Sequence, residues 1–242
     1  MPHFFLFEGG LGAGKTLIAS TLAQYFRLKS GGEVRLFANY DLVNSTPFRH
    51  VDQWIEVAQA RGSIMLWDEA QTQFDRRTWS RNTFLTQLFN MTRKLRCVHF
   101  FMNPIGNNLD GRILALVEIF VEVRKRPNQY IELLLYEYQD KRYGPNGRFI
   151  KRLIVPWWKV KQIQSLELYD TDQMLYPFPV PSTERKETEL LQRMIEAQQE
   201  AAKLEKEGVK VNELSGWINP SDRHEDREKK RSESSETRLF IS

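Results

Sequence analysis

One glycine-rich loop limits the folds open to this chain more than any other feature of its sequence. Residues Gly9–Thr16 match the pattern G-x-x-x-x-G-K-[ST] and lie between an apolar run, His3–Phe7, and an amphipathic one, Thr16–Leu28. Glycines reach backbone conformations closed to other residues, so successive N–H groups and the start of the helix point at one phosphate group. The order of strand, loop and helix therefore predicts a binding site for a nucleoside triphosphate. The predicted phosphate-binding residues are Gly9, Gly10, Leu11, Gly12, Ala13, Gly14, Lys15 and Thr16.

Two side chains of this loop have separate predicted roles. Lys15 is expected to bring a positive charge to the β- and γ-phosphates and so to act in catalysis. The hydroxyl of Thr16 is expected to coordinate Mg²⁺, which bridges the same two phosphates. The loop therefore predicts ATP and Mg²⁺ as the ligands of the chain.

A second, acidic motif separates hydrolysis from other phosphoryl chemistry. The mainly apolar segment Ser63–Trp67 ends in Asp68 and Glu69. At the end of a strand beside the phosphate loop, Asp68 is expected to hold Mg²⁺, and Glu69 to orient and polarise the attacking water. A kinase uses a substrate hydroxyl as the nucleophile and has less need of a second carboxylate. The pair therefore favours ATP hydrolysis over phosphate transfer to a small molecule.

Four further residues are candidates for contacts that act during hydrolysis. Asn103 ends the apolar run Val98–Met102, where it either contacts the γ-phosphate or the water, or serves as turn chemistry before Pro104. Three arginines that follow the acidic motif are candidates for an arginine finger that completes a neighbouring subunit's site. The alternative is that they form a solvated or acid-paired surface. These arginines are Arg76, Arg77 and Arg93.

Short apolar runs alternate with helical periodicity as far as about Val123, which is typical of βα units around a parallel sheet. This predicts an α/β fold, a three-layer αβα sandwich of the P-loop NTPase type. Two later runs, Tyr130–Tyr138 and Phe149–Val155, flank turn residues and predict an antiparallel hairpin that extends one edge of the sheet. The predicted strands are His3–Phe7, Val34–Ala38, Ser63–Trp67, Val98–Met102 and Ile119–Val123. The predicted helices are Thr16–Leu28, Val51–Ala60, Asn82–Leu95 and Asn108–Leu116.

Three prolines between Pro177 and Pro181 predict a boundary after a P-loop domain that covers residues 1–176. Residues 177–181 are expected to form a linker, and residues 182–207 an amphipathic helix. The apolar side chains of this helix recur at 4-3-4-3 spacing, and they either dock another protein or pack on the chain's own domain. This stripe consists of Leu190, Met194, Ala197, Ala201 and Leu204. Residues 208–242 form a charged tail that is expected to be disordered.

Composition bounds the compartment and the partners of the chain. The single cysteine, Cys97, excludes an intramolecular disulfide framework and fits a reducing compartment. No segment is apolar over the ~20 residues that span a bilayer, so a cytoplasmic protein without an integral membrane segment is expected. A net charge of +4 permits a polyanionic partner without requiring one.

Basic and aromatic residues gather around the predicted hairpin. They suit contact with the backbone and bases of nucleic acid, but a sheet edge guarded by charge has the same composition. The basic residues are Arg124, Lys125, Arg126, Lys141, Arg142, Arg148, Lys151 and Arg152, and the aromatic ones are Tyr130, Tyr143 and Trp157. Both interpretations are open at this point.

Several short elements together resemble the zonula occludens toxin (Zot) family. Beyond the two motifs above, they are Phe74 with Arg76 and Arg77, Met91-Thr92-Arg93 before a strand, Leu109-Asp110-x-Arg112, and Tyr169-Asp170-Thr171. The resemblance covers about residues 1–176 and implies the N-terminal ATPase domain of that family. The family includes the assembly ATPase of filamentous phages and looks related to FtsK/HerA-type DNA-pumping motors. By resemblance, the chain is a homo-oligomeric motor for phage DNA extrusion or virion assembly, with DNA and phage coat or membrane assembly proteins as partners.

The chain departs from the pattern of that family at three points. Asn103 stands where members have Gln, and Lys94 follows Arg93 where members have His. A helix and a charged tail take the place of the membrane-spanning helix of phage assembly members. These differences favour a motor recruited to the inner face of the host membrane by a separate membrane protein. An FtsK/HerA-type genome-packaging motor, a small-molecule kinase and a nucleotide-dependent switch are the alternative functions.

Overall fold

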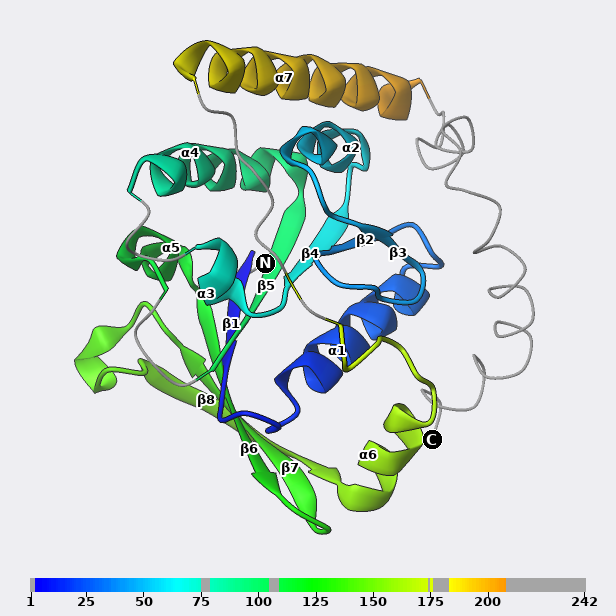
Figure 1. The fold of residues 1–242 in the computed structure, drawn as a ribbon, viewed down its shortest axis with the longest axis vertical. Helices are drawn as coiled ribbons and strands as arrows, with labels where there is room; N and C mark the ends of the chain where they lie inside the picture. Colours follow the sequence, from blue (N-terminus) through cyan, green and yellow to red (C-terminus); the bar gives the residue numbers. More distant parts are fainter. Residues whose placement is uncertain (1–2, 75–78, 105–108, 174, 176–182, 208–242) are drawn as a thin grey trace.

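An eight-stranded sheet organises the fold, with the strand order β3-β2-β4-β5-β1-β6-β7-β8 (Figure 1). The computed structural model describes the chain except residues 1–2, 75–78, 105–108, 174, 176–182 and 208–242. The strands are β1 (Phe4–Glu8), β2 (Arg35–Ala38), β3 (Ser45–Pro47), β4 (Ser63–Trp67), β5 (Cys97–Asn103), β6 (Ile119–Arg126), β7 (Tyr130–Glu137) and β8 (Arg148–Pro156). The α-helices are α1 (Lys15–Lys29), α2 (Trp54–Gln59), α3 (Ala70–Gln73), α4 (Trp79–Leu95), α5 (Gly111–Leu116), α6 (Trp157–Gln164) and α7 (Glu184–Lys206). Two 3₁₀ turns are η1 (Val51–Gln53) and η2 (Lys141–Tyr143).

The sheet is parallel from β3 to β6 and antiparallel beyond. β1 pairs in parallel with β5 and β6, and β7 and β8 then add antiparallel strands at the β6 edge. Every residue of β4 and of β5 is buried, as expected for central strands that helices cover on both faces. The predicted α/β fold, with a mainly parallel sheet and an antiparallel extension, is therefore confirmed.

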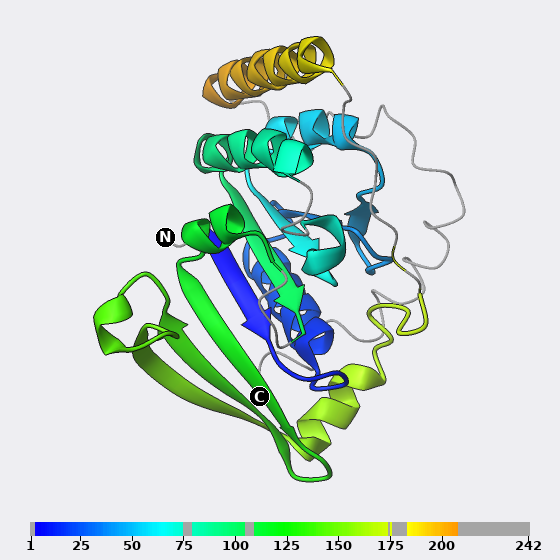
Figure 2. The same ribbon diagram turned by 60° about the vertical axis from the view of Figure 1, so that its left-hand side comes forward.

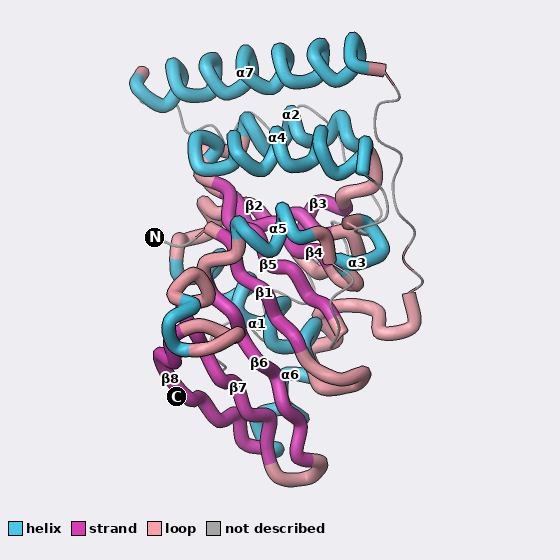
Figure 3. Tube along the Cα trace, turned by 90° about the vertical axis from the view of Figure 1, so that its left-hand side faces the viewer, coloured by secondary structure: helices cyan, strands magenta, loops and turns pink. Residues whose placement is uncertain are grey.

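Helices cover both faces of the sheet and form the outer layers of a sandwich (Figures 1 and 2). α1 and α6 bury apolar side chains on one face, and α2, α4 and α5 do so on the other. α7 lies outside α2 and α4, along the side of the molecule away from β8 (Figure 3). The phosphate loop joins β1 to α1 at the carboxyl edge of the parallel strands, where ligands of open α/β sheets bind.

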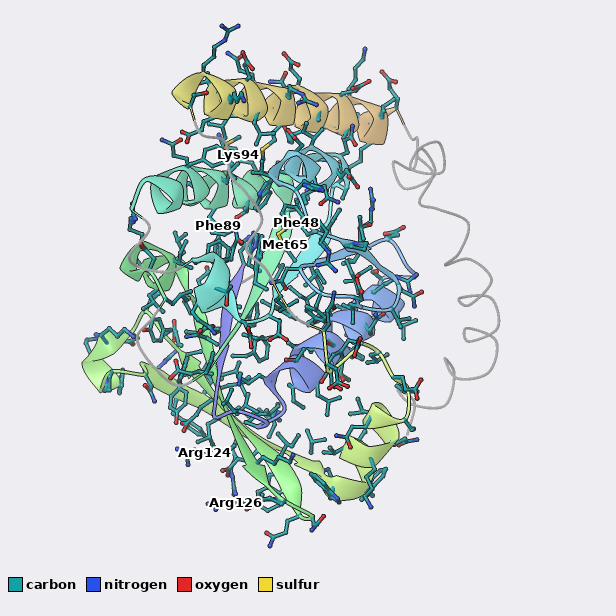
Figure 4. All side chains as sticks on the ribbon, viewed as in Figure 1. Phe48, Met65, Phe89, Lys94, Arg124 and Arg126 are labelled. Atoms are coloured by element: carbon teal, nitrogen blue, oxygen red, sulfur yellow. The ribbon has the colours of Figure 1, made fainter. Side chains whose placement is uncertain are left out.

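An aromatic cluster fills the layer between the sheet and the helices α2 and α4. Figure 4 labels Phe48 and Phe89 in this layer, where both pack against the buried Trp67 with ring centroids 5.4 and 6.4 Å from it. The indole Nε1 of Trp67 donates a hydrogen bond of 3.2 Å to Nδ1 of His99. Burial, together with the charge of His3, lowers the pKa of His99 to about 3, so the ring is neutral at ordinary pH. A neutral, buried imidazole therefore serves as a core side chain here.

The sequence did not predict two elements that border the site. β3 has only three residues, none of them apolar, which leaves no periodic pattern to detect. α6 follows β8 directly, with Pro156 as its N-cap residue, and buries only Val160 and Ile163. Two buried positions among lysines and glutamines give a weak helical signal, so the predicted strand simply ended at Val155.

The C-terminal helix decides between the two interpretations of its apolar stripe. The helix begins at Glu184, and the Thr183 side chain caps it by accepting a hydrogen bond of 3.4 Å from the Lys186 N–H. Leu190, Met194, Ala197 and Ala201 are buried in the core shared with α2 and α4. The stripe therefore packs on the chain's own fold, and the idea that it docks another protein is wrong because α2 already covers it. The tail predicted for residues 208–242 lies outside the described residues.

Candidate functional site

Glycine is required at both ends of the phosphate loop. A Cβ on Gly9 would lie 2.3 Å from the carbonyl oxygen of Val123. Gly14 has φ +95°, and a Cβ there would lie 2.7 Å from Cδ1 of Ile131. This residue precedes α1, so its left-handed conformation turns the backbone into the helix whose N–H groups face the loop. The middle of the loop is open to solvent, and Leu11 is 87% exposed.

The ammonium of Lys15 is directed at the loop itself. Its Nζ donates hydrogen bonds of 3.0 Å to the carbonyl of Gly9 and 3.1 Å to the carbonyl of Gly10. Burial lowers the pKa of Lys15, and the nearby carboxylates of Asp68 and Glu69 oppose that shift. The positive charge is thus held where the loop would surround a phosphate.

Thr16 and Asp68 connect the two predicted motifs. The Thr16 hydroxyl donates a hydrogen bond of 3.0 Å to Oδ2 of Asp68, across 52 positions of sequence. Burial raises the pKa of Asp68, and the hydrogen bond from Thr16 opposes the shift. Two oxygen ligands in neighbouring positions of an octahedral Mg²⁺ stand about 2.9 Å apart, given Mg–O distances of about 2.0–2.1 Å. The spacing of these two oxygens therefore fits Mg²⁺.

The rest of such a metal's coordination would have to come from outside the protein. Within the described residues there is no group of three or more His, Cys, Asp or Glu side chains that could hold a metal ion. Mg²⁺ commonly keeps water molecules and binds through one or two protein ligands together with substrate phosphates. Thr16 and Asp68 match that requirement.

Glu69 follows Asp68 in an unusual backbone conformation. Its φ is 47° and its ψ is 50°, in the left-handed region, and it caps the start of α3. Its N–H donates a hydrogen bond of 3.1 Å to Oδ1 of Asp68. A non-glycine residue in this region is uncommon and occurs preferentially at functional sites. The conformation turns Glu69 from the end of β4 toward the cavity that its side chain helps to line.

Asn39 holds the main chain of Asp68 and was not predicted from the sequence. Its Nδ2 donates 2.9 Å to the Asp68 carbonyl, and its Oδ1 accepts 2.8 Å from the Asp68 N–H. The guanidinium of Arg49 donates in turn to the main-chain carbonyl of Asn39. A single Asn after a strand carries no motif, so only the parallel pairing of β2 with β4 identifies its role.

Asn103 lies at the carboxyl end of β5, between the strands that carry the two motifs. It is 2% exposed and is paired in register with Glu8 of β1. The described lining of the cavity does not include it. The predicted contact between Asn103 and a γ-phosphate stays a prediction.

A cavity of about 340 Å³ lies over the phosphate loop. Four parts of the chain meet there: the loop with the start of α1, the acidic motif, the β6–β7 strands with α6, and the segment after α6. The lining residues are Gly12, Gly14, Lys15, Thr16, Leu17, Tyr40, Asp68, Glu69, Lys125, Ile131, Val160, Gln164, Tyr169, Asp170, Thr171, Gln173 and Leu175. The sequence placed only the first two of these four parts at the site.

Two tyrosines form part of the wall near the predicted metal site. Tyr40 shares a hydrogen bond of 2.7 Å with the buried hydroxyl of Ser20, and its ring packs edge-on against Tyr169 at 5.9 Å. Burial, with a further effect from the Asp68 carboxylate, raises the pKa of Tyr169 to about 12. Both phenols therefore stay protonated and available as hydrogen-bond donors. The Tyr169-Asp170-Thr171 element was noticed only through the family resemblance, and the structure brings it to the cavity.

The three candidate finger arginines cannot be placed beside this cavity. Arg76 and Arg77 lie outside the described residues. Arg93 is part of α4, but the description does not extend to its side chain. Their predicted role stays a prediction.

No helix in the described part of the chain is both long and apolar enough to cross a membrane. The longest, α7, has charged residues along its whole length.

The fold and the loop together define the class of protein. A parallel sheet with a G-x-x-x-x-G-K-T loop between its β1 strand and α1, joined through Thr16 to an acidic strand end, is a P-loop NTPase fold. No family model matches the chain, and neither does any curated protein.

Among solved structures, the chain is similar to the N-terminal domain of zonular occludens toxin from Neisseria meningitidis. The identity is 19% and the TM-score 0.50, over 70% of this chain and 100% of that one. The genome packaging NTPase B204 from Sulfolobus turreted icosahedral virus 2, in complex with ATP-gammaS, matches with 10% identity and a TM-score of 0.42 over 64% of this chain and 96% of that one. The ATPase domain of a further protein matches with 12% identity and a TM-score of 0.45 over 63% and 80%. At 19% identity, the likeness to the zonular occludens toxin domain concerns the fold.

Proposed function

We propose that this chain is a Mg²⁺-dependent ATPase that drives phage or virion morphogenesis as a homo-oligomeric, DNA-moving motor. The observation that carries the ATPase assignment is the 3.0 Å hydrogen bond between Thr16 and Asp68. It joins the phosphate loop to the acidic strand end at the distance that Mg²⁺ requires of two neighbouring ligands. It also brings Glu69 to the same cavity.

The residues of the site divide the work of hydrolysis. The loop N–H groups and the start of α1 bind the β-phosphate, and Lys15 offsets the charge of the β- and γ-phosphates. Thr16 and Asp68 hold Mg²⁺, which when bound supplies further positive charge to the same phosphates. Glu69 orients the attacking water and accepts its proton. Asn103 acts at the γ-phosphate side, and one of Arg76, Arg77 and Arg93 acts as a finger from the neighbouring subunit.

The role in assembly is supported by two likenesses that point the same way. The short sequence elements resemble the Zot family, and the fold is similar to the zonular occludens toxin domain. In this proposal residues 1–176 are the motor domain, residues 177–181 the linker, residues 182–207 the C-terminal helix and residues 208–242 the charged tail. The motor works in the host cytoplasm, at the inner face of the membrane, with coat or membrane assembly proteins as partners.

Release of inorganic phosphate from ATP by the full chain, with and without Mg²⁺, tests the assignment. Lys15→Ala is expected to abolish nucleotide binding because it removes the cation of the loop. Glu69→Gln is expected to bind ATP normally but to lower kcat by about 10²–10⁴-fold, as is typical when a general base is lost. Glu196→Gln, a change at an exposed glutamate of α7, is the matched control and should leave kcat unchanged. Normal turnover by Glu69→Gln would remove Glu69 as the base.

The same assay separates the alternative functions. A genome-packaging motor should be stimulated strongly by duplex DNA, whereas an extrusion motor should depend more on its assembly partners. A phosphorylated small molecule with little free phosphate would indicate a kinase and contradict the proposal.

A further inference from the structure

The cavity over the phosphate loop has two ends that lie on opposite sides of β1. In the sheet order β4-β5-β1-β6-β7, Asp68 follows β4 on one side, whereas Lys125 and Ile131 come from β6 and β7 on the other. The first end is charged, with Asp68 and Glu69. The second end has α6 along it, which packs against α1 and β7 (Figure 1).

The direction of a bound triphosphate follows from the proposed function, on which this inference rests. Thr16 and Asp68 fix the metal that bridges the β- and γ-phosphates, so the terminal phosphates lie toward the charged end. The α-phosphate and the nucleoside must then extend away from Asp68, across the start of α1. That path leads from Thr16 past Leu17 to the end of the cavity bordered by α6.

The second end of the cavity has the chemistry that a nucleoside needs. Leu17, Ile131 and Val160 are buried apolar side chains, with exposures of 6%, 1% and 1%, and Leu175 adds a partly buried one above them. Small-molecule sites typically combine such apolar walls with a few polar groups that fix orientation. Gln164, at the last turn of α6, is the exposed amide at this rim, and among the described residues its side chain has no hydrogen-bond partner.

We propose that α6 and the segment that follows it form the nucleoside-binding part of the site. Val160 and Leu175 contact the faces of the base, and the Gln164 amide hydrogen-bonds to its edge. An amide offers both a donor and an acceptor, which is the arrangement that pairs with an adenine edge. The phosphate loop gives affinity for any triphosphate, and this segment adds the affinity that depends on the nucleoside.

Binding of two ligands to the full chain separates these contributions. Isothermal titration calorimetry with Mg²⁺ would compare ATP with inorganic tripolyphosphate, which has the phosphates but no nucleoside. ATP is expected to bind more tightly. Gln164→Ala is expected to weaken ATP by about threefold to tenfold, as is usual for one hydrogen bond, and Leu175→Ala by a similar factor. Neither variant should change the affinity for tripolyphosphate.

Gln162→Ala is a matched control, because Gln162 is an exposed glutamine of the same helix that does not line the cavity. It should change neither affinity. Equal effects on both ligands, or no effect of Gln164→Ala and Leu175→Ala on ATP, would overturn the nucleoside assignment while leaving the phosphate site intact. If Lys15→Ala binds both ligands as well as the wild type does, the proposed function itself fails, and the nucleoside assignment fails with it.

Discussion

At the scale of single residues, the main chain of the acidic motif is under strain and is held by one side chain. The left-handed conformation of Glu69 costs about 1–3 kcal/mol in general. Asn39 makes two hydrogen bonds to the main chain of Asp68, each of which contributes about 0.5–1.5 kcal/mol. The two magnitudes are similar, so Asn39 is well placed to offset the strain and to keep Glu69 directed at the cavity.

Asn39→Ala is therefore expected to lower kcat for ATP hydrolysis by about tenfold to hundredfold, since small misplacements of catalytic groups have effects of that size. The KM for ATP should change little because the phosphate loop is intact. Steady-state kinetics of the full chain measure both values. Asn146→Ala, in the turn before β8, is the control and should change neither. A KM that rises in proportion to the loss of kcat would show that Asn39 supports the whole site and does not position Glu69.

The sequence predicts the residues of this site only where they belong to local motifs. Lys15 and Thr16 follow from one loop, and Asp68 from a buried strand that must end at the same sheet edge. Asn39 is different, because its role depends on which strand lies next to β4. Tyr169 reaches the cavity through a bridge to Leu42 far away in the sequence, and no local pattern announces such a contact.

At the scale of elements, α7 is attached by buried apolar contacts more than by charge. Glu205 pairs with Arg61 at 2.6 Å and with Arg96 at 2.9 Å, and these bonds lower the pKa of Glu205. Ion pairs this exposed contribute only about 0–1 kcal/mol. Met194 is completely buried, and a buried methionine contributes several times more.

Met194→Ala is expected to lower the free energy of unfolding by about 2–5 kcal/mol, since it removes buried volume and leaves a cavity. Ile195→Ala is the matched control: Ile195 is the next residue of the helix, is 43% exposed, and should cost less than about 1 kcal/mol. Urea denaturation of the full chain measures both. Equal, small effects would mean that α7 does not rest on α2 and α4 in solution.

The helical periodicity of this segment identifies the buried stripe correctly but cannot say what covers it. Leu190 and Met194 have the same spacing whether the partner is α2 or another protein. The element that covers them lies far earlier in the chain. α6 shows the opposite limit, since its two buried residues are too few to mark a helix at all.

At the scale of the whole molecule, positive charge is concentrated at one end. Residues 119–161, from β6 into α6, hold ten Lys or Arg and four Asp or Glu, a net charge of +6, whereas the whole chain carries +4. Each of the four acidic residues is paired with an arginine of the same segment. In the described part of the chain, Arg126 and Lys151 lie in no ion pair. Exposed aromatic rings stand among them, with Trp158 at 65% and Phe149 at 54%.

This distribution favours contact with nucleic acid over a merely guarded sheet edge, because self-paired charges alone would leave no excess. We expect the double variant Arg126→Glu, Lys151→Glu to bind duplex DNA more weakly than the wild type. Each phosphate contact adds about 0.9 to the slope of log affinity against log salt concentration, so losing two should reduce the slope by about 2. Fluorescence anisotropy at several salt concentrations measures it.

Lys94→Glu is the control for this experiment. Lys94 is also exposed, and Figure 4 shows it near α4 and α7, at the other end of the molecule from Arg126. It should leave the salt slope unchanged, because a charge outside the contact releases no counterions from the DNA. If both variants weaken binding equally, only the net charge matters and the end formed by β6, β7 and β8 is no specific DNA surface. If neither does, these exposed cations guard the edge strand β8, and DNA contacts the motor elsewhere.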